Sequence, residues 1–323
     1  MRLVLGFVAG GLLAAFVLGE LGDHWWFGGL FAHFRYHILV VVLPFLAIAM
    51  LSRAWIAGAV MAIVVTGHVF LIVNVPKAPS VAGPVPGATR LRVVTLNIGF
   101  SNPVPDRAVR YLVAAKADIV LIQEIDGRIA SSIAQLKRSY PYIAPPDWRA
   151  GAENIILSRV PFASVETLNF PQNRATAVAV SLRLQGALLN VMTVHPYPAM
   201  SAFANDVHRS AFERFANVVR GRSGAWIVGG DFNATPWASR FRRLLRRTGL
   251  RLSGLSYRWP QSWPVPQSFG APSYLRIGIP IDHVLVSRHF ARLKQQRGPW
   301  VGSDHAPLTV DLVLLGKPVP SRE

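Results

Sequence analysis

The chain has 323 residues, and its 34 Lys and Arg against 16 Asp and Glu give a formal net charge of +18. Its mean hydropathy is nevertheless positive, a combination that is rare in soluble basic proteins, so part of the chain is expected to lie in a membrane. No cysteine is present, which excludes disulfides, thiolate nucleophiles and cysteine-ligated metals.

Three apolar stretches near the N-terminus are each close to the roughly 20 residues that a helix needs to cross a bilayer. They cover residues 3–19, 38–52 and 56–75, and the second is short and contains Pro44. We therefore predict a membrane region over residues 1–75 with about three transmembrane helices. The alternative is a cleaved signal peptide at 3–19 followed by a helical hairpin.

The charges that flank these stretches predict an orientation. Arg2 and Arg53 lie on one side of the predicted spans, whereas the intervening loop, residues 20–37, carries Glu20, Asp23 and Arg35. Positive residues favour the cytoplasmic side of a membrane. We expect a multi-pass protein of the inner (plasma) membrane, with the rest of the chain on the extracytoplasmic side.

A segment rich in Pro, Gly and Ala, residues 76–89, has no helical or strand periodicity and is typical of a linker. Residues 90–315 follow as a basic domain, and 316–323 form a tail. Within the domain, short apolar strands alternate with helical patterns, of which residues 201–222 are the longest. Several neighbouring strands are too close together for helical crossovers, which indicates mixed sheets with helices outside them.

Polar side chains recur where the predicted strands begin or end. Each alone has an ordinary explanation as a turn residue, a solvated strand end, a cap or a structural histidine. Together they indicate a site, because chemistry in such folds gathers on loops beyond the strand ends. The set is Asn97, Glu124, His195, Asp231, Asn233, Asp282, Asp304 and His305. Three of its carboxylates, Glu124, Asp231 and Asp304, suit a hard cation, and the lack of cysteine favours Mg²⁺ (or Mn²⁺) over Zn²⁺.

The ordered motifs "TLNI", "DIVLIQEI", "VHPYP", "GGDFNATP", "IDHVLVS" and "GSDHAPL" resemble the endonuclease/exonuclease/phosphatase family, the DNase I-like metallophosphoesterases. The resemblance covers about residues 91–314, and "GDFN" together with "SDH" is its most specific part. Within the family, the chain is most similar to the bacterial branch with an N-terminal membrane region. The resemblance implies an α/β fold, a four-layered α/β/β/α sandwich of two packed mixed sheets, here preceded by transmembrane helices.

The resemblance also implies residue roles. Glu124, Asn97 and Asp304 match the residues of the metal site. Asp231 would orient or deprotonate the attacking water, and Asn233 would hold a phosphate oxygen.

The two histidines of the set complete the implied catalytic residues. His305 matches the catalytic histidine, with Asp282 as its orienting carboxylate. His195 matches a second histidine, and which of the two is the acid or the base stays open. Arg174 precedes a predicted strand and is a candidate phosphate contact, although a surface arginine explains it equally well.

The expected activity is that of a membrane-anchored, Mg²⁺-dependent phosphodiesterase, a phosphoric ester hydrolase for which a nuclease-type reaction on nucleic acid is favoured. One alternative is the same chemistry on a phospholipid or another membrane phosphoester. Another is a catalytically idle domain that binds anions or a partner, although no protein partner is inferred. The six arginines of residues 240–252 suit a nucleic acid backbone or an anionic bilayer, or form a solvated basic face.

Overall fold

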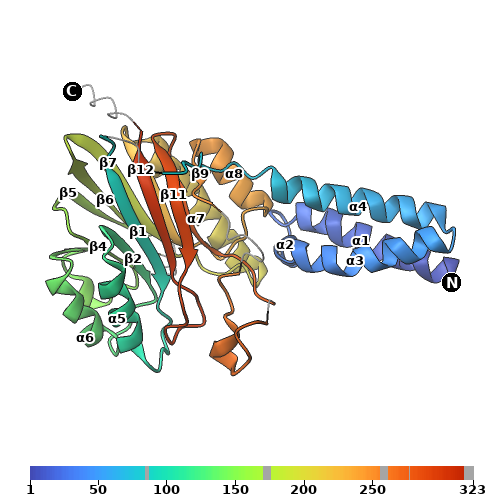
Figure 1. Cartoon of the computed structure of the whole chain (residues 1–323), viewed down its shortest axis with the longest axis horizontal. Coiled ribbons are helices and arrows are strands. Elements are labelled where there is room, and N and C mark those ends of the chain that lie inside the picture. Colours follow the sequence, from blue (N-terminus) through green and yellow to red (C-terminus); the bar gives the residue numbers. More distant parts are fainter. Residues whose placement is uncertain (84–86, 170–175, 255–260, 276, 316–323) are drawn as a thin grey trace.

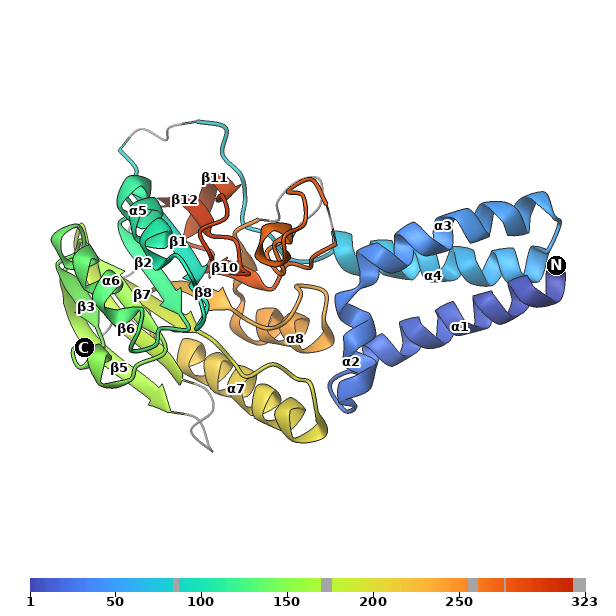
Figure 2. The same cartoon turned by 90° about the horizontal axis from the view of Figure 1, so that it is seen from below.

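The computed structural model describes residues 1–83, 87–169, 176–254, 261–275 and 277–315, and it consists of a helical bundle joined to an α/β domain (Figure 1). The bundle contains α1 (Arg2–Glu20), α2 (Trp26–His33), α3 (Arg35–Leu51) and α4 (Trp55–Val73). Helices α1, α3 and α4 lie side by side and extend away from the domain, whereas α2 lies against it (Figures 1 and 2).

Two of these helices, α1 and α4, are each long and apolar enough to cross a membrane. They coincide with the predicted stretches 3–19 and 56–75. The predicted span 38–52 lies in α3, which meets the same criterion only together with α2, at a bend of 69°. Residues 20–37 were expected to be a loop. The eight-residue helix α2 lies within them and has no side-chain N-cap, so the sequence carries little signal for it.

The α/β domain contains two six-stranded mixed sheets. The first has the order β11-β12-β1-β2-β4-β3, formed by β11 (Phe290–Arg297), β12 (Leu308–Leu314), β1 (Arg90–Asn97), β2 (Ile119–Gln123), β4 (Ile155–Ser158) and β3 (Tyr142–Ala144). The second has the order β5-β6-β7-β8-β10-β9, formed by β5 (Phe162–Asn169), β6 (Thr176–Leu184), β7 (Ala187–Val194), β8 (Ala225–Asp231), β10 (Asp282–Val286) and β9 (Arg251–Leu252).

Each sheet has one parallel pair, β1 with β2 and β7 with β8, and the remaining neighbours are antiparallel. Parallel strands require a crossover, and helices α5 (Pro105–Ala115) and α7 (Ala202–Arg220) supply one for each pair. Helix α8 (Ser239–Thr248) lies beside α7. Residues 130–138 form α6 (Ala130–Ala134), which is continued by the 3₁₀ turn η1 (Gln135–Arg138).

Three apolar layers hold the domain together. Side chains such as Val93, Leu121 and Ile227 fill the space between the two sheets. One outer layer packs α5 and α6 on the first sheet, and the other packs α7 and α8 on the second sheet. The domain is therefore the four-layered α/β/β/α sandwich that the family resemblance implied.

The segment that follows α4 is held against the domain by backbone hydrogen bonds. Ala78 N–H donates to the Leu252 carbonyl at 2.8 Å, and Val81 N–H donates to the Arg292 carbonyl at 3.0 Å. The part of the predicted linker before residue 84 thus extends along β9 and β11. Two independent chain segments, this one and α2, join the helical bundle to the domain.

Candidate active site

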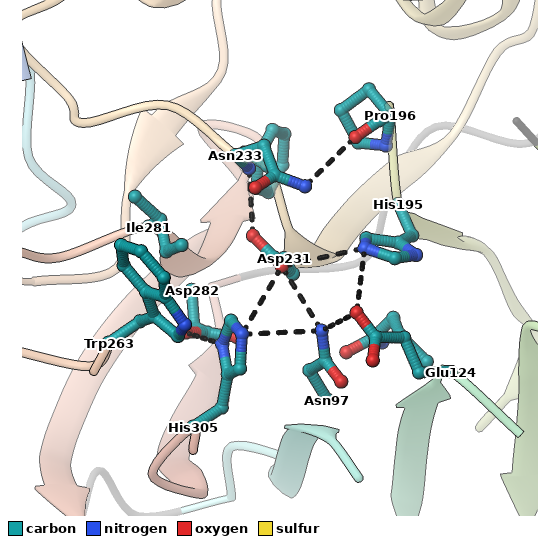
Figure 3. A network of polar contacts seen from close by, with 12 residues as sticks. Asn97, Glu124, His195, Pro196, Asp231, Asn233, Trp263, Ile281, Asp282 and His305 are labelled. Atoms are coloured by element: carbon teal, nitrogen blue, oxygen red, sulfur yellow. Dashed lines mark hydrogen bonds and ion pairs between the residues drawn. The ribbon is translucent and has the colours of Figure 1, made fainter. Parts of the chain in front are cut away.

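The predicted polar residues converge because the strands that carry them end together (Figure 3). Asn97 ends β1, Glu124 follows β2, His195 follows β7, and Asp231 ends β8. These are the four strands of the two parallel pairs, so each packed sheet contributes two of the side chains. Asp282 begins β10 directly opposite Asp231 in the antiparallel register, and Asp304 and His305 lie just before β12.

A cluster of acids and a histidine occupies the centre of this site. The Nε2 atom of His195 lies 3.3 Å from Glu124 Oε1 and 3.5 Å from Asp231 Oδ2. Asn97 Nδ2 donates to the same two carboxylates, at 2.8 and 3.1 Å. Gly99 N–H donates to Asn97 Oδ1 at 3.0 Å, which fixes the amide with its NH₂ group toward the acids.

A second pair of groups completes the site. His305 Nδ1 lies 2.8 Å from Asp282 Oδ2, and the opposite nitrogen, Nε2, faces Asp231 Oδ2 at 3.7 Å. The Asp282 backbone is held in turn, because its N–H donates to the Ser262 hydroxyl at 3.0 Å. A carboxylate behind an imidazole fixes the tautomer of the ring and stabilises its charged form.

The backbone at the site adopts conformations that few side chains tolerate. Glu124 has φ 60° and Asn233 has φ 46°, both in the left-handed region. At Asn233 the turn lets its N–H donate to Asp231 Oδ1 at 2.8 Å, and its side-chain amide donates to the Pro196 carbonyl at 3.0 Å. Non-glycine residues in this region mark positions where the surrounding structure enforces the geometry.

Burial and neighbouring charges shift the pKa values of two site residues. Burial raises the pKa of Asp231 to about 6, helped by the Asp282 carboxylate and opposed by the two histidines. For His305, burial favours the neutral ring, but the carboxylates of Asp282 and Asp231 outweigh it and raise the pKa to about 10. Near neutral pH the site therefore holds an imidazolium beside a buried carboxylate.

Glu124, His195 and Asp231 have ligand atoms within 4.8 Å of one another, close enough to contact a single metal ion. Asp231, Asp282 and His305 form a second such group. Asp304, predicted to bind metal, accepts a hydrogen bond from Trp263 Nε1 at 2.8 Å through Oδ2. Arg174 lies outside the described residues. The roles assigned to all these residues stay predictions.

Sequence reasoning named neither Trp263 nor Ser262 as a site residue. Trp263 binds Asp304, and its ring lies 6.3 Å from that of His305. Ser262 accepts N–H groups from both Ile281 and Asp282. The available signal was the composition of residues 257–280, which are rich in Trp and Pro and directly precede Asp282.

Comparison with known proteins agrees with this geometry. The sequence matches the Endonuclease/Exonuclease/phosphatase family over residues 94–305, about two thirds of the chain, so the chain belongs to that family. The enzyme class expected from the sequence, a metal-dependent phosphoric ester hydrolase, is thereby confirmed. A sequence search of curated proteins gives no match.

Solved structures with a similar fold share little sequence with the chain. An endonuclease/exonuclease/phosphatase from Beutenbergia cavernae is 20% identical, with TM-score 0.56, covering 72% of this chain and 74% of that one. Beta toxin from Staphylococcus aureus, solved with bound magnesium ions, is 16% identical, with TM-score 0.53 and coverage of 69% and 99%. TDP2 from D. rerio, complexed with a single-strand DNA product, is 14% identical, with TM-score 0.55 and coverage of 69% and 99%.

Proposed function

We propose that the protein is a membrane-anchored, Mg²⁺-dependent phosphodiesterase that hydrolyses its substrate by attack of water. The observation that carries the proposal is the convergence of Glu124, His195, Asp231 and the His305–Asp282 pair at one edge of the two sheets. An idle binding domain would not need this complete set of acids and histidines in mutual contact.

The donor set suits a hard cation. Glu124 and Asp231 offer carboxylate oxygens close to each other, and Mg²⁺ in enzymes is commonly held by one or two carboxylates together with water and substrate phosphate. When bound, the ion would neutralise phosphoryl oxygens and lower the pKa of a coordinated water. His195 Nε2, 3.3 Å from Glu124, would border this position.

The side chains of the chain itself supply the remaining chemistry. His305 Nε2, with Asp282 behind the ring, carries or accepts a proton at the reacting phosphate. The carboxylate of Asp231 orients the attacking water, and the Asn233 amide contacts a phosphoryl oxygen. Asp304, held by Trp263, adds negative charge to the site and so supports cation binding.

Nucleic acid is the favoured substrate class, because one similar structure was solved with a single-strand DNA product. The apolar helices α1 and α4 favour a second class, membrane phosphoesters, because a bilayer anchor would concentrate them near the site. The basic helix α8 lends less support to nucleic acid than its composition suggests. Three of its arginines, Arg240, Arg242 and Arg243, form ion pairs within the chain.

The test uses the full-length protein in detergent micelles with Mg²⁺. Turnover is measured on plasmid DNA, single-stranded DNA, RNA, vesicles containing sphingomyelin or phosphoinositides, and bis(p-nitrophenyl) phosphate. Asp231→Asn and His305→Ala serve as matched inactive variants, with circular dichroism to confirm their fold. Metal-dependent turnover that both variants lose supports the proposal, and wild-type inactivity on every substrate contradicts it.

The proposed topology places Arg2 and Arg53 in the cytoplasm and the α/β domain outside the plasma membrane. The α/β domain lies at the end of the bundle where α1 and α4 finish, opposite Arg2 and the α3–α4 turn (Figure 2). Alkaline phosphatase fused after Glu323 should be active in intact cells, because the enzyme folds only on the extracytoplasmic side. An inactive alkaline phosphatase fusion, together with a fluorescent green fluorescent protein fusion at the same position, would place the domain in the cytoplasm and reverse the assignment.

A further inference from the structure

The site loop, residues 231–235, is held by three histidines that bind its backbone. His208 Nε2 lies 3.1 Å from the Phe232 carbonyl, and His283 Nε2 lies 3.1 Å from the Ala234 carbonyl. His33 Nδ1 lies 3.3 Å from the Thr235 N–H and 3.2 Å from its hydroxyl. The first two histidines belong to the α/β domain, but His33 ends α2 of the N-terminal bundle.

A second link runs from the same part of the bundle to the loop through His208. Asp23 and Arg240 form an ion pair at 3.3 Å, and both are buried. Arg240 Nη1 lies 2.6 Å from His208 Nδ1, and arginine is always the donor, so that nitrogen accepts. The ring proton is therefore on Nε2, where it donates to the Phe232 carbonyl, midway between Asp231 and Asn233.

Opposite charges face each other where the N-terminal bundle contacts α8. Glu20 and Asp23 are the only acidic residues among the first 75, and both pair with α8. Glu20 binds Arg242, and Asp23 binds Arg243 as well as Arg240. Aromatic packing adds to these pairs, because the rings of Tyr36 and the fully buried Trp237 lie 5.0 Å apart.

We propose that residues 20–37, here called the docking segment, position the site loop for catalysis, with Asp23 and His33 as positioning residues. This inference rests on the proposed function. The docking segment holds the loop at Thr235 directly and at Phe232 through Arg240 and His208. Asn233 lies between these two anchors and Asp231 directly precedes the first, so the N-terminal bundle is part of the catalytic structure as well as a candidate anchor.

The first experiment compares His33→Ala, His33→Asn and His24→Ala in the full-length protein, with Mg²⁺ and bis(p-nitrophenyl) phosphate. His24 is an exposed histidine of the same segment and is the matched control. His33→Ala should lower kcat by about 10-fold to 100-fold with little change in KM, because a misplaced catalytic group slows only the reaction. His33→Asn should recover most of the loss, since its amide oxygen can accept the Thr235 N–H. His24→Ala should match the wild type.

A second readout does not require turnover. Hydrogen exchange of the peptide that spans residues 229–238 should accelerate in His33→Ala and in Asp23→Asn but not in His24→Ala. If the wild-type protein hydrolyses nothing, the proposed function fails, and this exchange result still decides whether the segment positions the loop. A kcat within twofold of the wild type together with unchanged exchange in His33→Ala would overturn the inference.

A double-mutant cycle covers the case in which His33→Ala alone does not fold. Thr235→Val keeps the backbone N–H and removes the hydroxyl that faces His33. Combined with His33→Leu, which fills the space of the ring but cannot accept a hydrogen bond, it should lower kcat by less than the product of the two single effects, because both changes act on one contact. Independent effects that simply multiply would contradict a direct link between the two residues.

Discussion

The Nδ1 atom of His305 lies 2.8 Å from Oδ2 of Asp282, and this bond directs the other ring nitrogen toward Asp231. The strand register produces the arrangement, because Asp282 and Asp231 are directly opposed on β10 and β8. One carboxylate therefore orients the ring from behind while the other faces its reactive nitrogen.

Replacing Asp282 with Asn should lower kcat by about 100-fold or more, because positioned acid–base groups contribute about 10² to 10⁴-fold. The pKa of His305, now about 10, should fall, since the variant removes the strongest charge that favours the imidazolium. The pH–rate profile and the ¹⁵N chemical shifts of the ring both report this change. An unaltered profile would show that Asp282 does not control His305. Asp311→Asn, far from the site on β12, is the control.

Local signals in the sequence predicted mixed sheets with outer helices and most of the candidate site, whereas the four-layered sandwich was implied by the family resemblance. Apolar runs mark β1, β2, β7 and β8, and the polar residue at the end of each run needs no long-range information. The edge strands β5 and β11 were not predicted. Most residues of β5 are exposed, and β11 continues into charged and amide residues, so neither is a continuous apolar run.

The contact between the docking segment and α8 could not be predicted in this way. Asp23 and Arg243 are 220 residues apart, and nothing near either residue specifies the other. The arginines of α8 had suggested a surface for nucleic acid or anionic lipid. Three of them instead neutralise the two acids of the docking segment, and only the folded chain shows that pairing.

Glu124 is expected to be essential for cation binding. Glu124→Gln should raise the Mg²⁺ concentration needed for half-maximal turnover by at least about tenfold. Even the mutation of a residue that only supports a metal ligand typically lowers metal affinity by about 10-fold to 100-fold. Chelation with EDTA should abolish wild-type turnover, and added Mg²⁺ should restore it. Glu153→Gln, at an exposed position, is the control. Equal Mg²⁺ requirements in both variants would remove Glu124 from the metal site.

Gly230 should be irreplaceable for steric reasons. Its φ is +147°, and a Cβ there would lie 2.0 Å from the Val194 carbonyl oxygen, next to His195. Gly230→Ala should therefore lower the free energy of unfolding by about 1–3 kcal/mol beyond the backbone strain, and reduce turnover as His195 shifts. Gly249→Ala separates the steric clash from the backbone strain, because that glycine also has positive φ but has open space around it. This variant should lower the free energy of unfolding by about 1 kcal/mol. Urea unfolding followed by tryptophan fluorescence compares them, and similar losses would argue against the steric explanation.

The buried histidines that hold the site loop should make the domain sensitive to acid. Burial lowers the pKa of His283 to about 4, from 6.5 for an exposed ring. Below pH 6.5 the His283 ring binds a proton in the unfolded chain but stays neutral in the folded one. The free energy of unfolding therefore decreases as pH falls toward 4. His283 alone should account for a loss of about 2 kcal/mol between pH 7 and pH 5. His208, whose pKa burial also lowers, adds to the loss. In His283→Gln the side-chain amide can still donate to the Ala234 carbonyl but does not titrate. Denaturant titrations at the two pH values should therefore show a weaker pH dependence for the variant, and an equal dependence would assign the acid sensitivity to other groups.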